Sequence, residues 1–322
     1  MTYSIVALDP ATGDLGVATQ SKFLAVGAVV PWARAGVGAI ATQSFANVAY
    51  GPDGLHALKA GHSAREVLER LVADDPRREH RQAGIVDAHG GSATHTGREC
   101  FAWAGGRTGP GYAAQGNILA GPAVVDGIVE TFSGGGAPFP ELLVACLAAA
   151  EAGGGDRRGR ESAALLIVRE AGGYGGGNDI WIDLRVDHHD DPVGELGRLL
   201  ELQHLYLDKP AAAELLPLDP ALAAELRSLM TRIGAQPGGA FGNVYQPMWQ
   251  VAGWEPPANE AAADAERAMT GEPRPLPEGW DDTWQGALWD WMGVENLEER
   301  TAAPGWIDPR VLSLLRSRAE RG

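Results

Sequence analysis

The apolar and polar positions at the start of the chain follow a strand pattern. Two stretches that are apolar and rich in β-branched residues, at 2–8 and 15–22, flank a cluster of turn-forming residues at 9–14. Strand-like runs separated by such a cluster are typical of an antiparallel hairpin. The sequence therefore predicts that the chain begins with a hairpin.

The turn also predicts the register of this hairpin. If Asp9 and Asp14 face each other, the numbers of paired residues add up to about 23, and opposed residues on neighbouring strands lie only about 5 Å apart. Thr2 is then expected beside Ser21 or Lys22.

The pattern up to residue 207 predicts four strands, two helices, four strands, two helices, two strands and one helix. After the hairpin, strands are expected at 28–34, 37–42, 83–87, 92–94, 100–103, 111–117, 163–168 and 180–185, and helices at 52–60, from 63, and at 122–132, 140–152 and 192–207. Helices that come in pairs exclude a doubly wound βαβ fold. We expect an α+β fold with four αββα layers: two packed antiparallel sheets, each covered by helices on its outer face.

The last third of the chain has a different composition. Residues 208–218 contain two prolines that leave little room for a helix, which predicts a linker. A helix is expected to open at Asp219 and stop at Gly234, followed by a passage rich in Gly, Pro and Ala to about residue 279 and by a final helix from Asp308. Seven of the ten tryptophans lie in this part, so we expect three segments: a domain at 1–207, a linker at 208–218 and a helical domain at 219–322.

Charge and cysteine content limit the classes of function. The formal net charge of −16 argues against nucleic acid and anionic membranes as partners. Cys100 and Cys146 form no CxxC pair, which indicates a reducing compartment. The sequence has no signal-peptide pattern and no apolar run long enough to span a bilayer, so we expect a cytoplasmic protein.

Thr2 is the first candidate for chemistry. If Met1 is removed, the Thr2 hydroxyl can attack a carbonyl carbon while its own α-amine accepts the proton. Ser4 is the rival nucleophile, but it would need a separate base and no histidine is near it in the sequence. The simpler alternative is that Thr2 is only a strand residue.

The hairpin and the element order resemble the N-terminal-nucleophile (Ntn) hydrolases, in particular their proteasome-like members. Residues 2–206 resemble a bacterial family of unknown function assigned to that fold, on the residues at 2–7, 23–27, 41–47, 115–121 and 155–159. This resemblance implies an amidohydrolase but gives no substrate.

The Ntn resemblance implies roles for several residues. Thr2 would be the nucleophile, Lys22 would lower the pKa of its amine, Asp156 would orient the amine, and Asn117 or Asn47 would bind the oxyanion. The candidate substrate-binding residues are Ser21, Gln43, Ser44, Asn47, Arg157 and Arg158, the two arginines because guanidinium groups bind carboxylates. Each has a structural alternative: a solvated strand end for Lys22, a surface pair with the arginines for Asp156, and a turn-forming position for either asparagine.

The C-terminal part resembles a peptidoglycan-binding module that accompanies this family. The resemblance rests on residues 284–293, 295–300 and 305–309. Aromatic rings can stack on sugars, but Trp284, Leu288 and Trp291 have helical spacing, which favours core positions. Any peptidoglycan ligand of a cytoplasmic module would be a muropeptide fragment.

We therefore predict an Ntn-type amidohydrolase for a small amide or muropeptide-like, anionic substrate. The alternative is a ligand-binding protein that uses the same fold without turnover. Assembly into rings or dimers stays open. No cofactor is expected and no metal, because residues 187–191 fit an exposed acidic turn better than a ligand set and the glycine-rich run at 172–177 lacks the Lys and Ser/Thr of a phosphate-binding loop.

Overall fold

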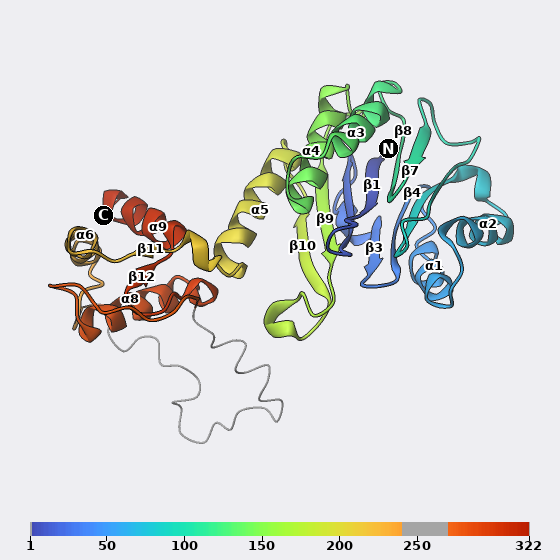
Figure 1. Ribbon diagram of the computed structural model, residues 1–322. Coiled ribbons are helices and arrows are strands. Elements are labelled where there is room, and N and C mark those ends of the chain that lie inside the picture. The colour runs from blue at the N-terminus through green and yellow to red at the C-terminus, as the bar shows by residue number, and fades with distance from the viewer. Residues whose placement is uncertain (1, 240–269, 322) are drawn as a thin grey trace, which may run out of the picture. The chain divides into compact units, whose positions relative to one another are not determined.

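The computed structural model describes residues 2–239 and 270–321 and divides the chain into two compact units. The first unit is Met1–Leu200 and the second is Glu201–Gly322, so the division falls within helix α5 (Pro192–Leu207). Met1, whose removal the Thr2 chemistry requires, lies outside the described residues, as does most of the passage expected between 235 and 279, including Gln246, Trp249 and Trp254. Figure 1 shows the elements of each unit.

The predicted hairpin is confirmed. Strands β1 (Thr2–Leu8) and β2 (Leu15–Ser21) pair antiparallel with Thr2 opposite Ser21, which is the predicted pairing sum. The Asp9 amide donates to the Asp14 carbonyl at 2.9 Å, and the Asp9 carboxylate accepts from the Ala11 amide inside the turn. These local bonds fix the register because a two-stranded hairpin inherits its pairing from its turn.

This hairpin lies in the middle of a six-stranded antiparallel sheet with the order β10-β9-β2-β1-β8-β7. Its other strands are β7 (Gly105–Gly109), β8 (Tyr112–Asn117), β9 (Ser162–Val168) and β10 (Ile180–Val186). Every residue of β1 is buried, as expected for a central strand that is covered on both faces.

A four-stranded antiparallel sheet with the order β3-β4-β5-β6 packs against this sheet. Its strands are β3 (Pro31–Arg34), β4 (Gly38–Ser44), β5 (Arg81–Asp87) and β6 (Ser92–Thr96). Small and branched side chains fill the space between the sheets, among them Val6, Val17, Ala41 and Val86. The alternation along β1 therefore sends even-numbered residues toward the second sheet.

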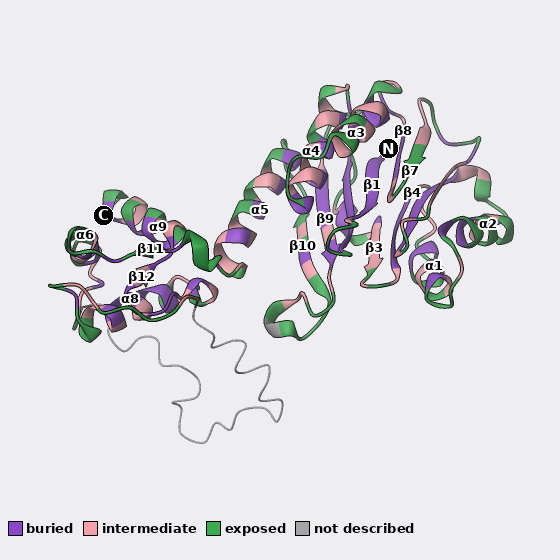
Figure 2. Cartoon of the chain, in the orientation of Figure 1, coloured by how far each residue is buried: buried purple, intermediate pink, exposed green. Residues whose placement is uncertain are grey.

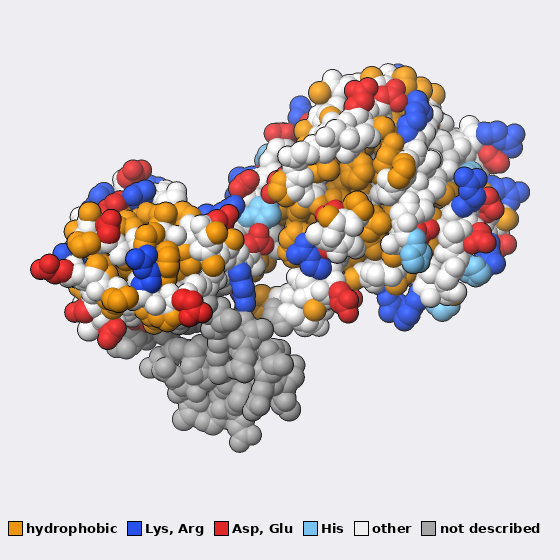
Figure 3. Space-filling model, in the orientation of Figure 1, with side chains coloured by type: hydrophobic (Ala, Val, Ile, Leu, Met, Phe, Trp, Pro, Cys, Tyr) orange, Lys and Arg blue, Asp and Glu red, His pale blue; other side chains and the backbone are white. Residues whose placement is uncertain are grey.

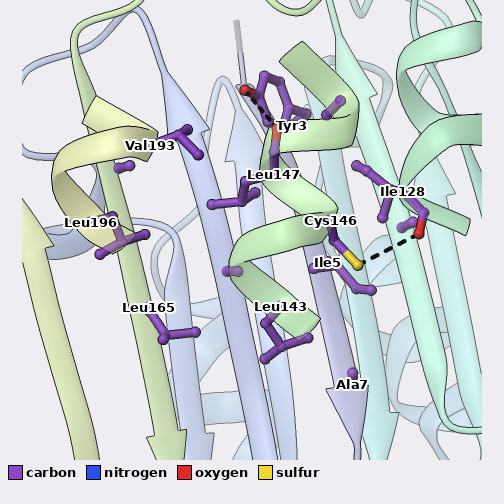
Figure 4. Packing of buried hydrophobic residues seen from close by; sticks show 14 of the residues in the cluster. Tyr3, Ile5, Ala7, Ile128, Leu143, Cys146, Leu147, Leu165, Val193 and Leu196 are labelled. Atoms are coloured by element: carbon purple, nitrogen blue, oxygen red, sulfur yellow. Dashed lines mark hydrogen bonds between the residues drawn. The ribbon is translucent and has the colours of Figure 1, made fainter. Parts of the chain in front are cut away.

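Two helix pairs cover the outer faces of the sheets. Helices α3 (Ala123–Gly134) and α4 (Phe139–Ala152) pack on the six-stranded sheet, and α1 (Tyr50–Lys59) and α2 (Ala64–Asp74) pack on the four-stranded sheet. Figure 4 shows Leu143, Cys146 and Leu147 of α4 against Tyr3 and Ile5 of β1. In Figure 2 the strands are mostly buried, while the helices expose one side.

The predicted element order of the first unit is confirmed, with local corrections. The Ser63–Glu66 capping box at the start of α2 is present. The strand expected at 100–103 is wrong: this segment is a loop whose Phe101 and Trp103 carbonyls accept from amides of residues 118 and 119, and the strand lies at 105–109. This strand contains glycines at 105, 106 and 109, and glycine has a low strand propensity, so the sequence pattern does not predict it. The strand expected at 28–34 begins only at Pro31, after a short 3₁₀ turn (Val26–Ala28).

The second unit is mainly helical, with α6 (Pro220–Arg232), α8 (Asp282–Val294) and α9 (Pro309–Arg321) around one core. Leu288 and Trp291 are buried in this core, and Trp284 packs against it, as their spacing predicted. Within the segment expected to be a linker, β11 (Leu216–Pro217) pairs with β12 (Trp306–Ile307).

Candidate active site

Thr2 is the first residue of β1 and lies between the last residues of β2 and β8. The register places it opposite Ser21 on β2 and opposite Asn117 on β8. Its hydroxyl oxygen lies 3.0 Å from the hydroxyl oxygen of Ser21. The Gln43 amide of the facing sheet donates to the Thr2 carbonyl at 3.3 Å. Both neighbouring strands and the opposite sheet therefore hold Thr2 in place.

A pocket of about 570 Å³ opens at this end of the two sheets. Its lining residues are Thr2, Ser21, Phe23, Val26, Val29, Val30, Gln43, Ser44, Phe45, Ala46, Arg77, His80, Arg81 and Arg158. The volume is in the range of pockets that hold small organic ligands. Four of the predicted residues, apart from Thr2, line it: Ser21, Gln43, Ser44 and Arg158.

Ser4, the rival nucleophile, is sealed between the sheets. It is fully buried, its hydroxyl donates to Gln43 Oε1 at 2.7 Å, and it accepts from Gln115 Nε2 at 2.7 Å. Ser4 is not among the residues that line the pocket. The structure therefore brings Thr2, and not Ser4, to the surface of the pocket.

A network of buried amides lies behind Thr2. Gln43 Nε2 donates to Gln82 Oε1 at 2.8 Å, and Asn117 Nδ2 donates to the same oxygen at 2.8 Å. Gln82 in turn donates to the carbonyl of residue 116 and to the Thr96 hydroxyl. Buried amides that are bonded to one another in this way hold fixed orientations. One N–H of Asn117 is thus occupied by Gln82, and Asn117 is buried and is not among the residues that line the pocket.

Asp156 holds the loop that follows α4 against the end of β2. Its buried carboxylate accepts from the backbone amides of Lys22 and Arg158, at 3.1 and 2.8 Å, and from the Arg158 guanidinium at 3.4 Å. Asp156 does not line the pocket, whereas Arg158 does. In this geometry, Asp156 positions the loop and Arg158.

The Lys22 ammonium is bonded to the residues that precede β9. Its Nζ donates to Glu161 Oε2 and to the carbonyl of Arg160, and hydrogen bonds from Lys22 and His188 lower the pKa of Glu161. Neighbouring residues at the end of an extended strand point to opposite sides, and Ser21 is the one that turns toward Thr2. Lys22 is not among the residues that line the pocket, and a role of its ammonium toward the Thr2 amine stays a prediction.

Asn47 and Arg157 also lie outside the pocket lining. Asn47 Nδ2 donates to Asp75 at 3.0 Å, and Arg157 reaches the carbonyl of residue 102 from an exposed position. Asp75 is buried and also accepts from Arg81 Nε at 2.8 Å. Asn47 thus supports the pocket through Asp75, and its side chain does not face a ligand there.

Sequence reasoning missed the basic residues of the pocket. Arg77, His80 and Arg81 come from the turn before β5 and from its first residue, and β5 reaches Thr2 only through the packing of the two sheets. The available signal was the concentration of basic residues at 77–81 in an acidic chain. Phe23 and Phe45 lie within the blocks that carry the family resemblance, which implies no role for them.

The first comparison concerns the first unit. A model described as "Family of unknown function (DUF1028)" matches residues 2–196. The chain belongs to this family. The crystal structure of a DUF1028 family protein, SPO2555 from Silicibacter pomeroyi, is similar: it has 30% sequence identity and a TM-score of 0.58, over 63% of this chain and 89% of that chain. The resemblance inferred from the sequence is thereby confirmed at the level of the family.

The second comparison concerns the second unit. A model described as "Putative peptidoglycan binding domain" matches residues 273–315, which include α8 and the first half of α9. No match was found among curated proteins. Among the described residues, none of the helices has the length and apolar character needed to cross a membrane.

Proposed function

We propose that the first unit is an N-terminal-nucleophile amidohydrolase in which Thr2 is the nucleophile. The observation that carries this proposal is the placement of Thr2: it lines the pocket with its hydroxyl 3.0 Å from that of Ser21, another lining residue, while Ser4 is fully buried between the sheets. The packing of two sheets between two helix pairs agrees with the αββα layering of the Ntn fold.

The proposed reaction is hydrolysis of a small amide. The Thr2 hydroxyl oxygen attacks the carbonyl carbon and its proton passes to the α-amine of Thr2, which then protonates the leaving nitrogen as the C–N bond breaks. Water hydrolyses the resulting ester, releasing the acid and restoring the hydroxyl. This mechanism requires that the mature chain begin at Thr2, because an acylated nitrogen has no basic lone pair.

Asn117 is the proposed oxyanion donor. It lies opposite Thr2 on β8, and Gln82 fixes its amide through one N–H. The second N–H of such an oriented amide is suited to stabilise charge that develops on a carbonyl oxygen. Ser21 is proposed to orient the Thr2 hydroxyl, from which it is 3.0 Å away.

His80 offers a different base within the same pocket. If His80 accepts the proton, a blocked Thr2 amine would be tolerated and His80→Gln would abolish turnover. If the α-amine accepts the proton, blocking the Thr2 amine would abolish turnover and His80→Gln would retain it. We favour the amine because it belongs to the same residue as the hydroxyl.

For the second unit, we propose binding of muropeptide fragments, supported by the family match over residues 273–315. Trp280 and Trp291 are buried in its core, so the partly exposed Trp284, Trp289 and Trp306 are the ones proposed to meet a sugar. The cytoplasmic location stays a prediction of the sequence.

The alternative to the hydrolase proposal is that the first unit binds its ligand without turnover.

Turnover of a panel of small amides tests the hydrolase proposal. Release of amine by the wild-type chain should be lost in Thr2→Ala and partly kept in Thr2→Ser, which retains both the hydroxyl and the amine. Ser4→Ala is the matched control, because it removes a hydroxyl two residues away that does not face the pocket. If Thr2→Ala keeps full turnover, Thr2 is not the nucleophile.

A further inference from the structure

The pocket beside Thr2 has a basic part and an apolar part. Arg77, His80, Arg81 and Arg158 contribute basic groups, and none of its lining residues in the described part of the chain is acidic. This differs from the rest of the surface: the chain carries a net charge of −16, and Figure 3 shows acidic and basic side chains interspersed over the visible face. A local excess of guanidinium groups in an acidic protein points to an anionic ligand.

The guanidinium of Arg81 is held in place by two neighbouring groups. Its side chain is only 6% exposed, with Nε bonded to Asp75 and Nη1 to the carbonyl of Phe45. Among the described residues, Nη2 of Arg81 has no assigned partner. A guanidinium held on two sides in this way loses little conformational entropy when a remaining N–H donor meets a carboxylate.

Arg77 adds a second guanidinium next to this fixed group. Its backbone amide donates to Asp75 at 2.8 Å, so the same carboxylate that holds Arg81 also holds the turn of Arg77. The Arg77 side chain is exposed, and no ion pair is assigned to it within residues 2–239 and 270–321. Asp75 pairs with Arg81 and Asp156 pairs with Arg158, and neither carboxylate lines the pocket. Two of the three arginine charges are therefore offset by groups outside the pocket lining.

The apolar part contains large side chains that are exposed to solvent. Phe23 is 53% exposed and Phe45 is 57% exposed, and both line the pocket together with valines 26, 29 and 30. The His80 ring packs against Phe45 at an interplanar angle of 82°, with 5.8 Å between ring centroids. Clustered exposed apolar side chains with a polar rim mark a ligand-binding surface.

We propose that the substrate is a small amide that carries both a free carboxylate and an aromatic or branched apolar group. The carboxylate binds Arg81 and Arg77, and the apolar group lies against Phe23 and Phe45. That the substrate is an amide rests on the proposed hydrolase function. Recognition of the carboxylate and of the apolar group depends only on the residues that line the pocket.

Isothermal titration of full-length Thr2→Ala separates binding from turnover. The probes are N-phenylacetylglycine, its neutral analogue N-phenylacetylglycinamide and the small acid N-acetylglycine. The first should bind at least about tenfold more tightly than either of the others, because each lacks one of the two recognised groups.

Substitutions on this background assign the two parts of the pocket. Arg77→Ala should remove most of the preference for the acid over the glycinamide, and Phe45→Ala most of the preference for phenylacetyl over acetyl. Arg78→Ala is the matched control, since it removes the same charge from the next residue, which does not line the pocket. Equal or undetectable binding of all three probes, or preferences unchanged in both variants, would overturn the inference.

The same probes distinguish this inference from the hydrolase proposal. If the acid binds with the expected preferences but the wild-type chain cleaves no amide of this class, the substrate recognition stands and the hydrolase proposal fails. If the wild-type chain cleaves neutral and acidic amides equally well, the hydrolase proposal stands and the inference fails.

Discussion

The hydroxyl oxygens of Thr2 and Ser21 lie 3.0 Å apart, and both residues line the same pocket. This pair results directly from the hairpin turn, which sets Thr2 opposite Ser21. The six-residue turn fixes the register of the two strands. This register brings the two hydroxyl groups together at the end of the sheets where the pocket opens.

Ser21→Ala tests the orienting role of this pair. A net hydrogen bond between neutral groups contributes about 0.5–1.5 kcal/mol, so kcat/KM should fall by up to about tenfold while the protein stays folded. The reaction still has its nucleophile, so the loss should be much smaller than in Thr2→Ala. Steady-state kinetics and circular dichroism measure the two effects. An unchanged kcat/KM would remove Ser21 from the mechanism.

The Asp75–Arg81 pair should give the first unit a specific sensitivity to acid. Burial alone would raise the pKa of Asp75, but hydrogen bonds from Arg81, the Arg77 amide and Asn47 outweigh it and hold that pKa below its ordinary value. The unfolded carboxyl binds protons near pH 4, whereas the folded one does so only at lower pH. The stability contributed by Asp75 is therefore complete above about pH 4 and is lost as the pH falls through the folded pKa.

Asp75→Asn should cost about 3–5 kcal/mol near neutral pH, because it leaves a buried guanidinium without its carboxylate. The difference in stability from the wild type should narrow as the pH is lowered below about 4. Calorimetric unfolding between pH 3 and 7 measures both effects, with exposed Asp74→Asn as the control. Parallel pH curves for wild type and Asp75→Asn would contradict the assignment.

The first unit should keep its fold and its turnover when the chain ends after Leu200, the last residue of that unit. An end at 207 is less suitable, because Leu205 and Tyr206 pack against the core of the second unit and would be left exposed. Circular dichroism, light scattering and amide turnover of the shortened chain test this. Loss of folding would show that the first unit depends on residues after 200.

The sequence predicted local features well. The hairpin register follows from the turn around Asp9 and Asp14, and the start of α2 follows from Ser63 and Glu66, because each depends on residues a few positions apart. The order of strands and helices in the first unit also follows from local periodicity. The glycine-rich strand β7 was missed because its residues have little strand propensity of their own.

The site could be predicted only in part, because its walls come from distant segments. Arg81 lies opposite Ser44 in the second sheet, and no local pattern connects either residue to Thr2. The directions of Lys22 and Arg157 depend on partners more than fifty residues away in the sequence, at Glu161 and at the carbonyl of residue 102. Their placement is set by tertiary contacts.

Mass spectrometry of the intact chain, followed by peptide mapping after incubation with an acylating β-lactone probe, tests the central claim most directly. The account predicts a mature chain that begins at Thr2 and a single acyl adduct on the peptide that contains Thr2, absent in Thr2→Ala and in a chain that retains Met1. An adduct on another residue of the wild type, or full turnover by a chain shown to retain Met1, would contradict it.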